Sequence, residues 1–170
     1  MQLDDIRSLF LYNSWANDRV VSVVATVPEE EYHKDLRSSH GGIHGTLVHL
    51  MGAEEIWIKR WLGERPTRIA RPEDYPGFTE LCAHWKEVDG RAHAFVDALR
   101  SDEDIRRIVQ YADLRGNPYA QPLGRLMQHV VNHSSYHRGQ VACLLRQTGI
   151  KPVDTDLVVF YREQDASRRH

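Results

Sequence analysis

Two histidines one helical turn apart, His133 and His137, are the residues of this chain whose spacing most directly suggests chemistry. Both lie in a stripe of residues spaced three or four apart, which is the apolar face of an amphipathic helix, at positions where Leu or Val is expected. The other members of this stripe are Leu123, Leu126, Val130, Val141, Leu144 and Thr148. Burying two imidazoles is costly unless each ring nitrogen finds a partner. Because residues at i and i+4 of a helix point the same way, one divalent metal ion would satisfy both.

The alternative is that each histidine is a core residue hydrogen-bonded to its neighbours. A single histidine on an apolar face favours this alternative, whereas two at ligand spacing favour the metal. His129 extends the series by one more turn. Residues eight apart on a helix are separated by about 12 Å, however, so one ion cannot readily take all three histidines. A third ligand must therefore come from another helix.

The rest of the chain predicts the helices that would position these ligands. Apolar periodicity and the placement of proline and glycine indicate four long amphipathic helices, over residues 3–27, 43–62, 78–99 and 123–149. They predict an all-α four-helix bundle with antiparallel helices. Metal sites in such bundles are built from inward side chains on facing helices.

The segments between these helices are predicted to be irregular or short. Residues 29–42 are polar and irregular, and residues 63–77 contain three prolines, which is typical of a surface loop. Weak strand character and a Gly-Asn-Pro turn signal in residues 102–121 predict a small hairpin or an extended crossover before the last long helix. The apolar residues of 153–163 must pack on the end of the bundle or on a partner, and everything after Gln164 is expected to be a frayed tail.

Several polar residues lie on the predicted apolar faces and need partners there. His49 is the natural third metal ligand, although it could instead be a core histidine bonded to a backbone carbonyl. Glu54 predicts either a buried partner such as an Arg or Asn, or a role beside the metal. Asn13 and Asn17 are one turn apart and could hydrogen-bond across to another helix or face water.

Other potential ligands are expected to have no part in the chemistry. His84 and His93 lie off the apolar stripe of the third long helix and are predicted to be solvated. Cys82 and Cys143 form no CxxC motif and are interpreted as core-filling thiols in a reducing cytosol.

Composition restricts the class of protein. The chain has 170 residues, 41% hydrophobic and 27% charged, and its formal net charge of −2 gives no basic field for nucleic acid or an anionic membrane. No apolar run is long enough to span a bilayer, and the first residues are acidic where a signal peptide would be basic. We therefore expect a single cytoplasmic domain over residues 1–170, with neither a nucleic acid nor a membrane as partner.

Four stretches of the sequence resemble the DinB/YfiT-like family of metal-binding four-helix bundles. They are residues 12–19, 47–57, 132–140 and 152–156, which follow the order of elements in that family. The resemblance implies that His49, His133 and His137 hold one divalent metal ion, with His129 as a neighbour. The resemblance also implies a homodimer. Some members of the family it resembles look like metal-dependent thiol transferases or thiol-dependent isomerases.

Three neutral imidazoles would leave the ion open positions, as in catalytic sites. A thiol or water bound there would lose its proton near neutral pH. Imidazole ligands suit zinc or nickel, taken here as the first candidates, and also iron or copper. Tyr136, Arg138 and Gln140, together with Glu54, are candidate supporting or substrate-binding groups.

Three functions follow from these observations. The first is a metal-dependent enzyme that acts by thiol transfer or hydrolysis, with a small thiol or electrophile as its partner. The second is a noncatalytic metal-binding stress-response protein. The third is a helical dimerisation module in which the histidines are merely structural.

Aromatic residues in three places also favour a homodimer, because one small core need not absorb all of them. These residues are Trp57, Trp61, Trp85, Phe160 and Tyr161. The alternative is that they simply fill the core of one chain.

Overall fold

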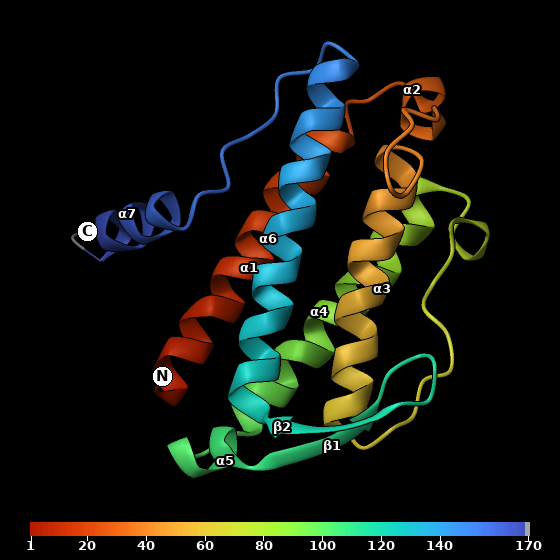
Figure 1. Cartoon of the computed structure of the whole chain (residues 1–170). Coiled ribbons are helices and arrows are strands. Elements are labelled where there is room, and N and C mark those ends of the chain that lie inside the picture. Colours follow the sequence, from red (N-terminus) through yellow and green to blue (C-terminus); the bar gives the residue numbers. More distant parts are fainter. Residues whose placement is uncertain (169–170) are drawn as a thin grey trace.

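The computed structural model describes residues 1–168, and its centre is a bundle of four long helices (Figure 1). They are α1 (Leu3–Val24), α3 (Ile43–Trp61), α4 (Phe78–Ala98) and α6 (Leu123–Gln147). The predicted all-α bundle is confirmed, and each helix ends slightly before its predicted boundary. After α1, for example, the amides of Thr26 and Val27 bond to carbonyls three residues back, so the chain tightens into a turn there.

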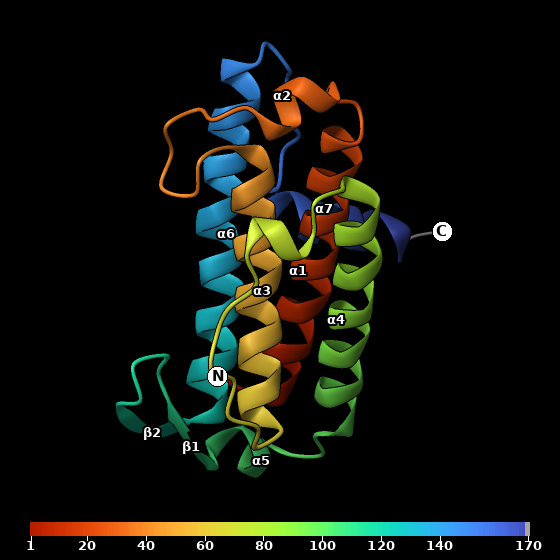
Figure 2. The same ribbon diagram turned by 90° about the vertical axis from the view of Figure 1, so that its right-hand side faces the viewer.

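The four helices form a ring in which α1 packs on α4, α4 on α3, α3 on α6, and α6 on α1. Both views show α1 and α6 running in one direction and α3 and α4 in the other (Figures 1 and 2). The antiparallel prediction is therefore wrong for two neighbouring pairs, α3–α4 and α1–α6, which are parallel. Residues 62–77 form the long return along the bundle, with a short 3-10 helix, η1 (Pro72–Asp74), on the way.

The small hairpin predicted before the last long helix is present. Strands β1 (Ile108–Ala112) and β2 (Pro118–Pro122) pair antiparallel and lie across one end of the bundle (Figure 1). Gly116 supplies the positive φ of +88° in the connecting turn. The short helix α5 (Asp102–Arg106) precedes the hairpin, so the segment between α4 and α6 closes one end of the bundle rather than running along it.

Two further helices correct the sequence expectations. Helix α2 (Glu29–His33) lies within the segment predicted to be irregular, and it is too short to show apolar periodicity. Helix α7 (Leu157–Ser167) continues past Gln164, so the described part of the predicted frayed tail is helical up to Ser167, while residues 169–170 lie outside the described residues. Phe160 of α7 is buried against Tyr12 and Trp15 of α1, which places this apolar segment on the bundle.

The core absorbs most of the aromatic residues within one chain. Trp61, Trp85 and Phe160 are buried, Trp57 is half-buried, and Tyr161 is exposed. The two cysteines, by contrast, do not fill the core as predicted: Cys82 is half-buried and Cys143 is exposed. No helix within residues 1–168 combines the length and the apolar character needed to cross a bilayer.

Candidate metal centre

The bundle brings His49 of α3 beside His133 and His137 of α6. The ring centroid of His49 lies 5.3 Å from that of His133 and 4.5 Å from that of His137. The two α6 rings are 4.3 Å apart, as expected for residues one turn apart on a helix. The three histidines predicted from the sequence are therefore neighbours, although they come from helices that are distant in the sequence.

A fourth histidine, His40, belongs to the same cluster and was missed by the sequence reasoning. It lies in the loop between α2 and α3, and its ring stacks on that of His49 with centroids 3.9 Å apart. One ligand atom from each of His40, His49 and His137 lies within 4.8 Å of the other two. Within the described residues, this tightest group includes His40 and leaves out His133.

Glycines near His40 are the sequence signal that could have revealed it. The chain around it reads His-Gly-Gly-Ile-His-Gly, and Gly41 has a φ of +80°. A Cβ atom on Gly45 would lie 2.0 Å from the carbonyl oxygen of His40, so only glycine lets the loop approach α3 this closely.

Burial keeps these imidazoles neutral, which is the form that binds a metal. Desolvation, with smaller contributions from neighbouring histidines, lowers the pKa of His49 to about 3 and that of His133 to about 4. Desolvation also lowers the pKa of His40 and of His137. Unprotonated ring nitrogens are therefore available near neutral pH.

The partners of the ring nitrogens show which atoms are free for a ligand. Nδ1 of His137 donates to Oε1 of Gln140 at 2.7 Å, which leaves Nε2 as the lone-pair nitrogen. Nε2 of His133 is buried and has no hydrogen-bond partner within residues 1–168. An unpaired buried nitrogen is costly, and a bound cation would remove that cost, so the residues fit a metal ion.

A second polar cluster surrounds Glu54, which is buried on α3. Its Oε1 accepts hydrogen bonds from Asn13 (2.7 Å), Asn17 (3.0 Å) and Ser134 (2.8 Å). Its Oε2 accepts one from Nε1 of Trp85 at 2.7 Å. The prediction of a buried partner such as an Asn is confirmed, as is the prediction that Asn13 and Asn17 bond across to another helix.

Arg138 completes this cluster and compensates its charge. The side chain is 1% exposed, and its Nη1 donates to the amide oxygens of Asn13 and Asn17, each at 2.8 Å. The two amides thus link a buried guanidinium to the buried carboxylate of Glu54. The network joins α1, α3, α4 and α6, and through Ser134 it fixes the turn of α6 that carries His133.

The remaining candidates border the histidine cluster or lie outside it: the ring centroid of His129 is 5.7 Å from that of His133, and that of Tyr136 is 5.1 Å from that of His137. His129 is exposed and packs its ring on Trp57 at 5.2 Å, and Tyr136 is 64% exposed. His84 and His93 are half-buried, contrary to the prediction that they are solvated. Nε2 of His84 lies 3.3 Å from Glu55, and Nε2 of His93 lies 2.7 Å from the hydroxyl of Ser14.

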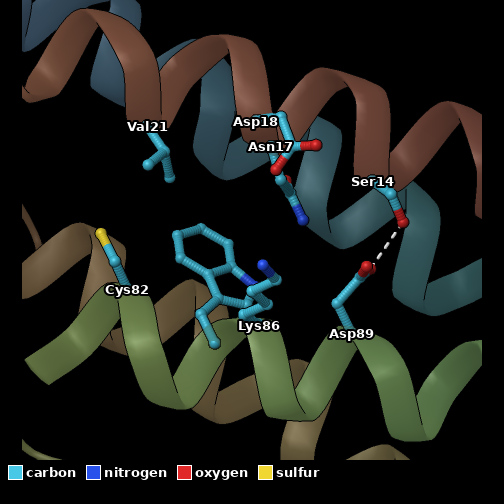
Figure 3. A pocket seen from close by; sticks show the side chains of 8 residues that line it. Ser14, Asn17, Asp18, Val21, Cys82, Lys86 and Asp89 are labelled. Atoms are coloured by element: carbon cyan, nitrogen blue, oxygen red, sulfur yellow. Dashed lines mark hydrogen bonds between the residues drawn. The ribbon is translucent and has the colours of Figure 1, made fainter.

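A cavity of about 350 Å³ lies between α1 and α4 (Figure 3). The histidines of the cluster do not line it, although Asn17 and Trp85 do, and both donate to Glu54. Figure 3 shows the Ser14–Asp89 hydrogen bond at one side of this cavity. Burial raises the pKa of the Cys82 thiol on its wall, which makes that thiol a poor nucleophile.

Comparisons with known proteins agree in pointing to one family. The model of the DinB family matches residues 1–169. Protein DinB of Bacillus subtilis (strain 168) is 28% identical over 160 residues, covering 89% of this chain and 91% of that protein. The uncharacterized protein YrdA of the same organism is 30% identical over 81 residues, or 48% of this chain and 47% of its own length.

A solved structure shares the fold. The crystal structure of a DinB-like protein from Bacillus cereus ATCC 10987 superposes with a TM-score of 0.59 at 20% identity. The match covers 85% of this chain and 94% of that one. At this identity the likeness speaks for the bundle alone.

Proposed function

Because the chain belongs to the DinB family, we propose that it holds one divalent metal ion through His49, His133 and His137 and acts as a metal-dependent enzyme on small molecules. The observation that carries the metal proposal is the convergence of three neutral imidazoles from α3 and α6, one of which has a buried nitrogen without a partner. When bound, an ion with an open position lowers the pKa of a water or thiol and so supplies a nucleophile near neutral pH.

The residues of the chain prepare the site for this ion. Gln140 fixes the ring of His137 by accepting its Nδ1 proton, which directs the other nitrogen toward the cluster. Ser134 bonds to Glu54 and thereby holds the α6 turn of His133 against α3, the helix of His49. The ligands therefore lie on rigid helices whose relative position is set by buried hydrogen bonds.

Zinc or nickel is our first proposal for the metal, with iron or copper as alternatives, because imidazole nitrogen suits all four. The proposed reaction is thiol transfer or hydrolysis, with a small thiol or electrophile as the partner molecule. The competing proposals are a noncatalytic metal-binding stress-response protein in the cytoplasm and a dimerisation module.

Elemental analysis of the purified chain and of single-site variants tests the metal centre. We expect about one ion per chain, lost on replacing His49, His133 or His137 with Ala and kept in the His129→Ala variant, since His129 is not among the proposed ligands. Loss of the ion from the His129 variant together with its retention in the His49 variant would contradict the ligand assignment.

Turnover separates the enzyme from the noncatalytic alternative. The measurement is reaction of a panel of small electrophiles with small thiols, before and after chelation. Equal rates for metal-loaded and metal-free protein would end the proposal of a metal-dependent enzyme.

A homodimer remains part of the proposal. Leu11 on α1 and Tyr161 on α7 are 54% and 43% exposed and line one groove between these two helices. Apolar side chains gathered there offer a surface for a second copy. Light scattering at micromolar concentration decides the question, since a monomeric mass would refute the dimer.

A further inference from the structure

The loop between α2 and α3 places His40 where it can reach the same ion as the predicted ligands. Its ring centroid is 3.9 Å from that of His49 and 5.3 Å from that of His137. Its ligand atom lies within 4.8 Å of those of both residues. The ring nitrogens of His40 form no hydrogen bond within residues 1–168, and the aromatic contacts of its ring there are both with histidines of the cluster.

The loop is shaped to hold His40 there. The amide of Leu36 donates to the carbonyl of Gly41 at 2.8 Å, which closes the loop on itself. The hydroxyl of Ser39 lies 3.4 Å from Nε2 of Gln140, the residue that also fixes His137. In Figure 2 this loop extends beside the upper part of α6. The backbone therefore directs His40 to the cluster through contacts that are independent of any metal.

We propose that His40 is a fourth, displaceable ligand of the ion held by His49, His133 and His137, and that a small thiol reaches the ion by displacing it. This inference rests on the proposed metal centre. With His40 bound, four imidazoles would hold the ion, as in closed structural sites, whereas catalytic sites keep an open position. The thiol would bind as its anion and release its proton to solvent, and the His40 imidazole would leave as a neutral group.

The difference between loop and helix explains why His40 is the ligand that leaves. His49, His133 and His137 are fixed on α3 and α6, which pack directly against each other. His40 is carried by a connecting loop, and its ring can stay stacked on the ring of His49 when it does not bind the ion. A thiolate is a softer ligand than imidazole and competes well for zinc, nickel or cobalt.

The test uses the full chain loaded with Co²⁺, whose visible spectrum reports its ligands. His40→Ala and His40→Gln are compared with the wild type and with the matched control His129→Ala, and 2-mercaptoethanol is the thiol probe. If His40 occupies the fourth position in about 90% of molecules, its removal strengthens thiol binding about tenfold, because the competitor is gone. We expect both His40 variants to bind one ion with an altered cobalt spectrum, and His129→Ala to match the wild type.

Each outcome decides a separate claim. If the His40 variants keep the wild-type spectrum and thiol affinity, His40 only stacks on His49 and the displaceable-ligand proposal is wrong, while the metal centre stands. If His40→Ala loses the ion and His133→Ala retains it, His40 is one of three permanent ligands, which also overturns the proposal. If the wild type binds no stoichiometric ion, the proposed function itself fails and this inference fails with it. Far-UV circular dichroism of each variant confirms that the bundle is folded.

Discussion

Two polar clusters occupy the interior of the bundle, and they differ in the partners that the protein offers to their central polar atoms. The Glu54 carboxylate accepts four hydrogen bonds from side chains of three other helices. In the histidine cluster, Nε2 of His133 is buried and has no partner in the described part of the chain. Residues of both clusters lie on α3 and α6, so burial alone does not separate structure from function. The kind of unpaired nitrogen does: in the Glu54 cluster the buried Nε of Arg138 also has no partner, but it is a donor, whereas an imidazole nitrogen can offer the lone pair that a metal ion needs.

The largest effect is expected from removing the Glu54 carboxylate, which is the centre of its cluster. Glu54→Ala leaves four donors without their acceptor and the buried guanidinium of Arg138 without its counter-charge, and should lower the free energy of unfolding by about 3–5 kcal/mol. The measurement is urea denaturation of the metal-free protein. Glu87→Ala is the control, since that side chain is 74% exposed and its loss should cost under about 1 kcal/mol. Similar losses in both variants would mean that the network contributes little to stability.

The histidine cluster should stabilise the protein only when a metal ion is bound. Zn²⁺ at about 100 times its Kd should add about 2.7 kcal/mol to the unfolding free energy, since the ion binds the folded state. This gain should vanish in His137→Ala and persist in His129→Ala, whose exposed side chain is not among the proposed ligands. The readout is the denaturation midpoint with and without the metal. A gain that survives in His137→Ala would place the ion elsewhere.

Acid should affect the metal-free histidine cluster in a defined direction. The folded-state pKa values of His49 and His133 are about 3 and about 4, below the unfolded value of about 6.5. The unfolded state therefore binds more protons between these values, and stability falls as the pH drops from about 6.5 to about 4. Each of these histidines contributes a slope of up to about 1.4 kcal/mol per pH unit. Denaturation at a series of pH values measures this slope, which should flatten in the His49→Ala, His133→Ala double variant.

A smaller effect is expected from the hydrogen bond that supports His137. Gln140→Ala removes the acceptor of its Nδ1 proton and should weaken metal binding about 10- to 100-fold, as for other outer-shell partners. Competition with a chelator measures the affinity. Gln128→Ala, which removes an exposed glutamine from the same helix, is the matched control. Equal affinities for the two variants would mean that Gln140 does not orient the ring.

The smallest effect is expected at His129. Its side chain is exposed, so His129→Ala should change stability by no more than about 0.5 kcal/mol, with little effect on metal affinity. Chelator competition and urea denaturation of the same sample give both numbers. A large loss of affinity would extend the metal centre one turn further along α6 than we propose.

The sequence predicts the bundle well because each long helix shows its apolar periodicity within its own residues. The stripe that includes His133 and His137 identifies α6, and the turn signal at Gly116 identifies the hairpin. His40 is different, since its place depends on loop contacts such as the close approach of its carbonyl to Gly45, and no periodicity records such a contact. Helix α2 was missed for a related reason, because one turn is too short to show a repeat.

The direction of the helices was also beyond sequence reasoning. A loop as long as residues 62–77 can either turn back at once or travel the length of the bundle, and its prolines are compatible with both. The neighbours of Glu54 show the same limit: an acidic residue in an apolar stripe predicts that partners exist, while Trp85 and Ser134 could be identified only from the packed helices.

The hydrogen bonds to Glu54 also determine when, during synthesis of the chain, the core can close. The amide donors lie 41 and 37 residues before it, Trp85 lies 31 residues after it, and Ser134 follows 80 residues after it. A nascent chain that stops before α6 has three of these donors but lacks both Ser134 and Arg138, so it would have to bury the carboxylate without its compensating cation. We therefore expect ribosome-bound chains truncated before α6 to stay open to proteases and to close once α6 has emerged. Long-range contacts of this kind slow folding, and here they delay closure of the core until the helix that carries His133 and His137 is available.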